Sequence, residues 1–335
     1  MNRRRTACPS ALALSLVVIA SACAGRQTLP PAPPQPVALS AAGPVGAPSV
    51  RVVATAYELY APTDTAARIA REELDYAASV FRSSFGGKLP VLAVVVFPSV
   101  EAMRTFDWFP LRRRGLISLP WLVELGDDPS RGRGGLEGTR ALSHEACHLF
   151  LIAHTGRTLG RTASRPTGAP RSYGDPALPD WFDEGVATLC EFPALRAQRR
   201  QQLGRVSDRT IPFADFFRME HPLYAQVQAL LAAQRAAAGT DTTSKPRGTT
   251  VQRLTIPLGG IPGLDAERGA VFYAQAHSVI EFLAERNGLE FVGLLGEALA
   301  RGQSVDQVLA RQVRSVPRDV SALEREWKAW LAKKG

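Results

Sequence analysis

Residues 142–152 read Leu-Ser-His-Glu-Ala-Cys-His-Leu-Phe-Leu-Ile, and this stretch carries the strongest structural signal in the chain. Two histidines, His144 and His148, stand four positions apart among apolar residues. On an α-helix, positions i and i+4 lie one turn apart on one face, so both imidazoles can bind one metal ion. Glu145 lies beside them, where a general base is needed. The sequence therefore predicts a buried helix over 138–155 that holds a metal site.

A second helix, predicted to begin at Trp181, offers a third ligand. Residues 180–188 read Asp-Trp-Phe-Asp-Glu-Gly-Val-Ala-Thr, and Glu184 is the best candidate. A zinc site with three protein ligands keeps its fourth position for water. The competing interpretation is a helix whose two histidines and glutamate lie at the surface and bind nothing.

The residues around Glu184 have competing interpretations. We expect Asp183 to cap the helix rather than to bind metal. Thr188 and Glu191 follow by one and two turns, so either could orient a metal-bound histidine, whereas a solvated surface acid is the favoured alternative for Glu191. Trp181 is expected to pack in the core rather than to form a platform for a substrate.

A hydrolytic site also needs a donor for a developing oxyanion. Tyr273 and His277 lie one turn apart on a predicted amphipathic helix over 265–287, so their side chains share a face. Either could serve as that catalytic donor, with Tyr273 slightly preferred. The alternative for Tyr273 is simple packing with its hydroxyl satisfied elsewhere. His154 and His221 are expected to be surface or loop residues.

The two motifs together resemble a known group of metallopeptidases. A His-Glu-x-x-His helix at 144–148, followed by Trp-x-x-Glu-Gly-x-Ala at 181–187, resembles the gluzincins, and most closely the bacterial peptidase MA-like families. The resemblance covers roughly residues 50–335, although only the two short motifs are specific. It implies a zincin-like fold, one zinc ion as cofactor, Glu184 as third ligand and a peptide or protein substrate.

The sequence departs from that pattern in the spacing of its motifs. Thirty-five residues separate His148 from Glu184, which is longer than in thermolysin-like or aminopeptidase-like gluzincins. Their substrate contacts therefore do not transfer to this chain. Two functions stay open: a zinc-dependent metallopeptidase of the cell envelope, and a catalytically inactive zincin-like lipoprotein that binds a peptide or an envelope polymer. Glu145 favours the first, because a structural zinc site needs no general base.

The first 23 residues predict export. Arg3 to Arg5 form a basic start, and an apolar run at 11–20 follows that is short for a membrane span. Residues 19–23, Ile-Ala-Ser-Ala-Cys, resemble a bacterial lipobox, which implies that Cys23 is lipidated and anchors the chain in the membrane facing the periplasm. The alternative is ordinary signal-peptidase cleavage near Ala22 or Ala24.

Charge and cysteine content bound the remaining possibilities. The 40 basic residues include three in the signal, so 37 remain against 31 acidic residues. The run at 112–114 is expected to be a solvated loop, and without a nucleic-acid-binding motif we predict no nucleic-acid partner. Cys147 and Cys190 could pair in an oxidising compartment, although two separate buried side chains are the favoured alternative.

The order of predicted elements indicates an α+β fold with a small mixed sheet packed on the metal-site helix. A proline-rich tether is expected over 24–50, a zincin-like catalytic domain over 51–200 and a helical C-terminal lobe of the same domain over 201–335. Strands are predicted at 51–60, 91–97 and, as an edge strand containing Pro120, 116–125. Helices are predicted at 64–84, with Asp64 as the N-cap candidate, and at 99–106, 289–301, 305–313 and 320–332.

Overall fold

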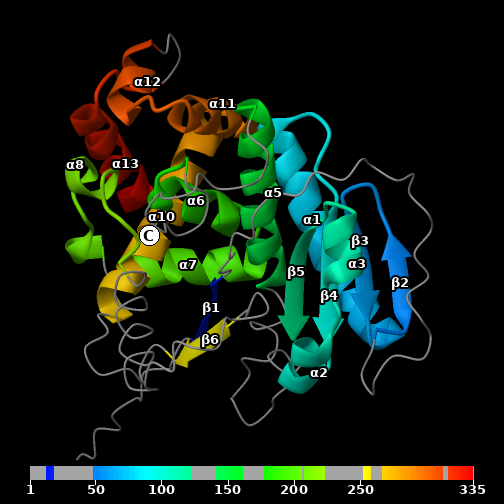
Figure 1. The fold of residues 1–335 in the computed structure, drawn as a ribbon. Helices are drawn as coiled ribbons and strands as arrows, with labels where there is room; N and C mark the ends of the chain where they lie inside the picture. The colour runs from blue at the N-terminus through cyan, green and yellow to red at the C-terminus, as the bar shows by residue number, and fades with distance from the viewer. Residues whose placement is uncertain are drawn as a thin grey trace, which may run out of the picture. The chain divides into compact units, whose positions relative to one another are not determined.

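Figure 1 shows the computed structural model of the chain. The structure describes residues 13–18, 48–122, 141–160, 177–205, 207–222, 252–257, 266–311 and 316–334. The chain divides into two compact units, one formed by Met1–Pro30 with His221–Ala270 and the other by Pro31–Glu220 with Val271–Gly335. The predicted tether lies outside the described residues up to position 47.

The first unit contains a two-stranded antiparallel sheet. Strand β1 (Ala13–Val18) pairs with β6 (Gln252–Pro257), so that Ala13 lies opposite Pro257. The sequence predicted neither strand. Because β1 lies within the predicted signal peptide, cleavage before Cys23 would remove it and leave β6 without this partner.

The second unit contains a four-stranded mixed sheet in the order β2-β3-β4-β5. The strand predicted over 51–60 is wrong, because the chain turns back after Val53 and Ala54 donates to the carbonyl of Tyr57 at 2.8 Å. The turn contains no glycine, proline or asparagine and so gave no local signal. The strands are β2 (Val50–Val53), β3 (Tyr57–Ala61), β4 (Leu92–Phe97) and β5 (Ile117–Leu122); β2 and β3 are antiparallel, and β3, β4 and β5 are parallel.

Both faces of this sheet are covered, as the continuous apolar run of β4 predicted. Alternate β4 residues from Leu92 to Val96 join the large core with helix α1 (Asp64–Phe85). The side chains on the other face of β4, those of Ala93, Val95 and Phe97, join a smaller cluster with α2 (Val100–Thr105) and α3 (Phe109–Arg113). In the described residues β5 pairs only with β4, which fits the predicted edge strand.

Two local predictions on this side of the molecule need correction. Thr63 rather than Asp64 caps α1, because its hydroxyl accepts from the Ala66 amide at 3.1 Å. The basic run at 112–114 is exposed at Arg113 and Arg114, as expected, but it is not simply a loop. Its first two residues end α3, and the guanidinium of Arg114 donates to the buried Glu58 carboxylate at 2.8 Å.

Helix α10 (Ala266–Asn287) lies among the remaining helices of the second unit. Every one of its residues from Val271 to Leu283 is buried. The predicted amphipathic pattern is therefore wrong over this stretch. Trp327 donates to the Ser278 hydroxyl at 2.7 Å and ties the last helix to α10. The helices predicted after residue 264 are confirmed as α10 (Ala266–Asn287), α11 (Leu289–Ala300), α12 (Val305–Arg311) and α13 (Val320–Lys334).

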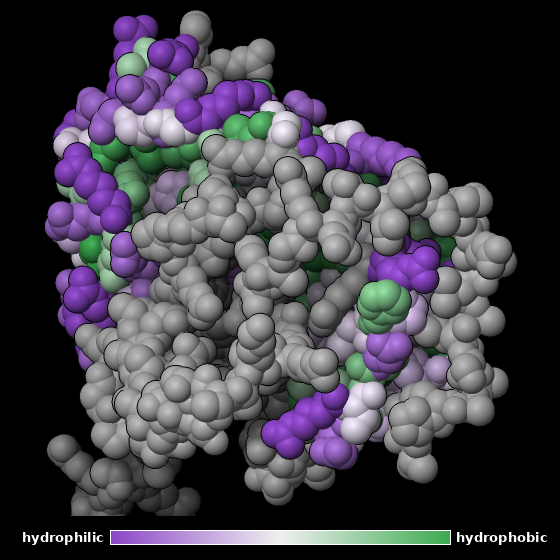
Figure 2. All heavy atoms as spheres, viewed as in Figure 1, coloured by the Kyte–Doolittle hydropathy of each residue, from purple (hydrophilic) through white to green (hydrophobic). Residues whose placement is uncertain are grey.

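The surface over α12 and α13 is mostly hydrophilic where it is visible, with apolar side chains between the helices (Figure 2). Within the described part of the chain, no helix combines the length and apolar character needed to cross a membrane. The second unit is thus an α+β structure in which a small mixed sheet is outnumbered by helices, as expected.

A disulfide joins the two helices that carry the predicted metal ligands. Cys147 of α5 (Leu142–Thr158) is bonded to Cys190, which follows α6 (Asp180–Leu189), across a Cα–Cα distance of 6.3 Å. Both cysteines are buried, as expected, but the favoured unpaired state is wrong. Sequence spacing gives no distance between two helices, and this pairing depends on that distance.

We predict that replacing both cysteines by alanine lowers the free energy of unfolding by about 3–4 kcal/mol, because the bond closes a long loop in the unfolded chain. The separation of the cysteines is 43 residues. Denaturant unfolding in the presence of a metal chelator measures the difference without a contribution from metal binding. The difference should disappear under reducing conditions, and a loss below about 0.5 kcal/mol in oxidising buffer would contradict the prediction.

Candidate metal centre

The N-terminus of α5 is fixed by a carboxylate from another helix. Ala141, at the cap position, has no side-chain hydrogen bond to offer. Instead Glu73 of α1, which is buried, accepts from the backbone amide of Ser143 at 3.1 Å. A negative charge at this end stabilises the helix. The cap lies one residue before His144 and therefore ties the start of the metal-site helix to α1.

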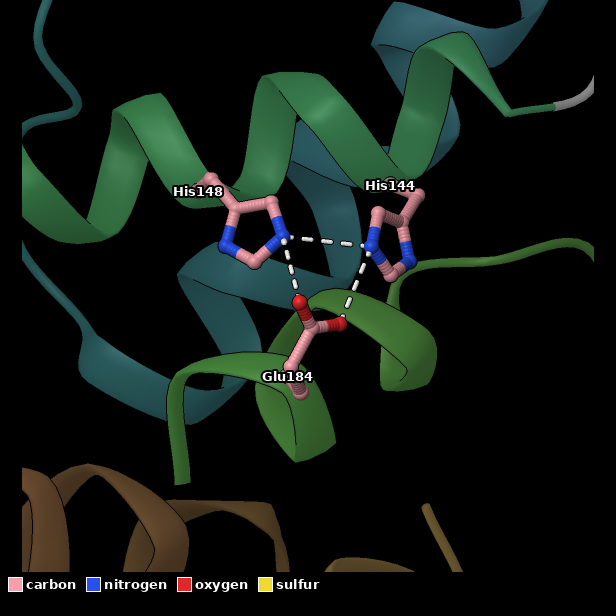
Figure 3. Close-up of side chains that lie close together, drawn as sticks. All are labelled: His144, His148 and Glu184. Atoms are coloured by element: carbon pink, nitrogen blue, oxygen red, sulfur yellow. Dashed lines mark hydrogen bonds and ion pairs between the residues drawn. The ribbon is translucent and has the colours of Figure 1, made fainter. Parts of the chain in front are cut away.

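His144, His148 and Glu184 converge on one point (Figure 3). The Nε2 atoms of the two histidines are 3.1 Å apart. The Glu184 carboxylate lies 3.3 Å from Nε2 of His144 and 3.8 Å from Nε2 of His148. Ligand bonds of about 2.0–2.1 Å in tetrahedral geometry place ligand atoms about 3.3 Å apart. The three residues therefore fit one face of a tetrahedral metal site, and the structure brings the predicted ligand set together.

The other ring nitrogen of each histidine is held by a carboxylate. Nδ1 of His144 lies 2.9 Å from Glu191, and Nδ1 of His148 lies 2.8 Å from Asp183. Such partners fix the ring orientation and the tautomer of metal-binding histidines. Both acids are at most 1% exposed, so the favoured surface position of Glu191 is wrong. Thr188, the other candidate, donates to the Gly185 carbonyl at 2.8 Å instead.

The predicted capping role of Asp183 is also wrong. Helix α6 begins after Pro179, which provides no side-chain cap, and the Asp183 carboxylate is turned toward His148. A single turn of α6 thus supplies both Glu184 toward the centre and Asp183 behind it. Trp181 is fully buried, which confirms the core position expected for it.

The hydrogen bonds decide where the protons of His144 lie. Burial raises the pKa of Glu191, but Arg199 and His144 outweigh it and bring that pKa to about 2. An ionised carboxylate can only accept, so Nδ1 of His144 donates to it. The Nε2 lone pair then faces the Glu184 carboxylate and the second imidazole. This convergence of electron-rich atoms requires a positive charge at its centre.

Without a metal, a proton on His144 supplies that charge. Burial lowers the pKa of His144, but contacts with Glu184 and Glu191 overcome this and raise it to about 10. The same residues favour a divalent cation. In the described part of the chain, three buried carboxylates, those of Asp183, Glu184 and Glu191, contact the two histidines, and Glu191 is also paired with the buried guanidinium of Arg199.

Gly185 allows α6 to approach α10 beside the third ligand. A Cβ at this position would lie 2.5 Å from Ile280 and 2.9 Å from the Ala276 carbonyl oxygen. The glycine of the Trp-x-x-Glu-Gly motif is therefore explained by close helix packing. A side chain here would move Glu184 away from the histidines.

The three predicted catalytic residues are placed less directly. Glu145 is half-buried and follows His144 on α5. Tyr273 is buried under Arg199, whose guanidinium carbon lies 5.7 Å from the ring centroid. His277 is fully buried; burial lowers its pKa to about 3, with Arg196, Arg199 and Arg200 acting in the same direction against Glu191. Its imidazole is therefore neutral at physiological pH.

His154 and His221 were expected at the surface or in loops. His154 is half-buried on α5, with its ring centroid 5.1 Å from that of Phe85. His221 is only 1% exposed. The prediction is therefore wrong for His154, whereas His221 lies in a loop, as expected, but is buried there. Neither residue belongs to the triad.

Sequence reasoning missed two residues around the centre, Glu73 and Arg199. Glu73 interrupts the apolar face of α1, and a buried acid on such a face is a signal for a partner. Arg199 stands in a run of basic residues that resembles a solvated helix face, so its burial gave no local sign.

Comparison of the chain with protein-family models, with curated proteins and with solved structures found no match.

We predict that zinc binding at neutral pH releases at least about one proton, because nearby carboxylates outweigh burial and raise the pKa of both His144 and His148, and each ring must be neutral to become a ligand. Zinc affinity should therefore rise at least about tenfold for each pH unit between pH 6 and 8. Competition with a chromophoric chelator at several pH values measures the slope. An affinity that is independent of pH over this range would contradict the prediction.

Proposed function

We propose that the chain is a zinc-dependent metallopeptidase of the gluzincin type, with His144, His148 and Glu184 as the zinc ligands. The observation that carries the proposal is the convergence of these three side chains within 3.8 Å. Asp183 and Glu191 behind the histidines support it, because such pairs are typical of zinc sites. Imidazole nitrogens and one carboxylate oxygen are a ligand set that suits zinc.

Glu145 has the position of a general base in this proposal. When bound, zinc acts as a Lewis acid and makes water a nucleophile at neutral pH. Glu145 accepts the proton of the attacking water and passes it to the leaving amine. Glu145 is only half-buried, whereas Glu184 is fully buried. Proton transfer and metal binding are thus assigned to different acids, Glu145 and Glu184.

His277 is the stronger of the two candidates for the oxyanion donor. Arg196 donates to its Nε2 at 3.5 Å, which leaves the proton of the neutral ring on Nδ1. That Nδ1 is buried and has no hydrogen-bond partner in the described structure. A neutral N–H donor without a partner is the kind of group that stabilises a developing negative charge. Tyr273, by contrast, packs against the guanidinium of Arg199.

We also propose that the enzyme works at the membrane surface, anchored through lipid on Cys23. The small residues before Cys23 and the proline-rich stretch after it support a tethered, exported protein. Cys23→Ser should move the chain from the membrane fraction to the soluble periplasmic fraction. An unchanged membrane fraction would contradict lipid anchoring at this residue.

The peptidase proposal predicts that Glu145→Gln keeps the zinc and loses about 100- to 10,000-fold in the rate of peptide cleavage, because it removes only the general base. Zinc content by elemental analysis and cleavage of a mixed peptide library are measured on the same samples. Glu72→Gln is the matched control, since Glu72 is an exposed acid on α1 and should leave both quantities unchanged.

Zinc binding without any peptide cleavage by the wild type would favour the catalytically inactive binding protein instead. Cleavage that survives Glu145→Gln would contradict the role given to Glu145. Absence of zinc from the wild type would contradict the metal centre itself.

A further inference from the structure

A buried arginine lies directly behind the acid that holds His144. Arg199 belongs to α7 (Pro193–Arg205), a mostly exposed helix in which Arg199 and Leu203 are the buried residues. Its Nη2 donates to one oxygen of Glu191 at 2.8 Å, and its Nε donates to the other at 3.2 Å. The oxygen bonded at 2.8 Å is the same one that accepts from Nδ1 of His144 at 2.9 Å.

Two other arginines of this helix make a separate contact. Arg196 and Arg200 both donate to Glu281 of α10, at 3.0 Å and 2.6 Å. Their side chains are 21% and 41% exposed, whereas that of Arg199 is 10% exposed. Helix α7 therefore directs one arginine to the metal centre and two to a separate pair. The guanidinium of Arg199 is also restrained by the ring of Tyr273 beneath it.

A two-pronged contact does more than neutralise charge. Two parallel N–H···O bonds fix both the position and the plane of a carboxylate, which a single ammonium contact cannot do. The orientation of Glu191 in turn sets the direction of the His144 ring, because the ring donates to one lone pair of that carboxylate. Displacement of a supporting group by about 1 Å is enough to weaken a metal site.

We propose that Arg199 is a positioning residue. It aims the Nε2 atom of His144 at the zinc by holding the Glu191 carboxylate through its Nε and Nη2 atoms. The proposal rests on the metal centre of the proposed function, but it does not require that peptides are cleaved. The ligand His144 is thus held by the carboxylate of Glu191, which is in turn held by the guanidinium of Arg199. The three residues come from three successive segments of the chain.

The test measures zinc dissociation constants by competition with a chromophoric chelator on the full chain. Arg199→Met should weaken zinc binding about 10- to 100-fold, as is usual when a partner of a ligand is lost. Arg199→Lys should recover only part of this loss, because it restores the charge without the fork. Arg200→Met is the matched control on the same helix, because Arg200 is 41% exposed and donates to Glu281, and it should bind zinc like the wild type.

A double variant keeps the proposal testable if Arg199→Met leaves Glu191 too poorly satisfied for folding. Arg199→Met combined with Glu191→Gln should bind zinc as Glu191→Gln alone does, because Arg199 acts through Glu191. The cobalt-substituted proteins provide a second readout, since the visible absorption bands of cobalt should change with the ligand geometry in Arg199→Met but not in Arg200→Met.

A folded Arg199→Met that binds zinc within about twofold of the wild type would overturn the proposal. So would an equal effect of Arg199→Met in the Glu191→Gln background, or full recovery by lysine. Wild-type protein that binds zinc tightly but cleaves no peptide would remove the enzymatic function and leave the role of Arg199 intact.

Discussion

Two imidazole nitrogens and a carboxylate face one another inside the protein, and this arrangement constrains the structure around it. These nitrogen and oxygen atoms lie 3.1 to 3.8 Å apart, and their lone pairs would repel one another without a positive charge between them. A proton on His144 or a divalent cation can supply that charge. The positions of Asp183, Glu191 and Arg199 follow from this constraint. Asp183 and Glu191 each fix one of the two histidines, and Arg199 balances the charge of Glu191.

The surrounding structure holds α5 and α6 in place from several directions. A disulfide links them, with Cys147 one residue before His148 and Cys190 one residue before Glu191. A buried carboxylate from α1 caps the start of α5, and a glycine lets α6 lie against α10. Preorganisation of this kind is what a metal site needs, because the ligands must be in place before the ion binds.

The parts of this architecture that depend on local spacing could be predicted from the sequence. The i, i+4 histidines and the later helices follow from the 3.6-residue period, and β4 follows from its continuous apolar run. Glu184 was found because a motif placed it on a second helix. The partners of the histidines were mostly misjudged: Asp183 fits a capping pattern equally well, and the pairing of Glu191 with Arg199 requires two segments to meet. Local sequence carries no signal for such tertiary contacts.

Zinc K-edge X-ray absorption on the full chain tests the central claim most directly. The account predicts one zinc ion per chain, with the scattering pattern of two imidazoles and oxygen ligands at about 2.0–2.2 Å, and loss of the bound zinc in Glu184→Ala. Cys147, which precedes His148, is bonded to Cys190 and so offers no thiolate to the ion. A sulfur shell at about 2.3 Å, a single imidazole, or zinc that remains bound in Glu184→Ala would contradict it.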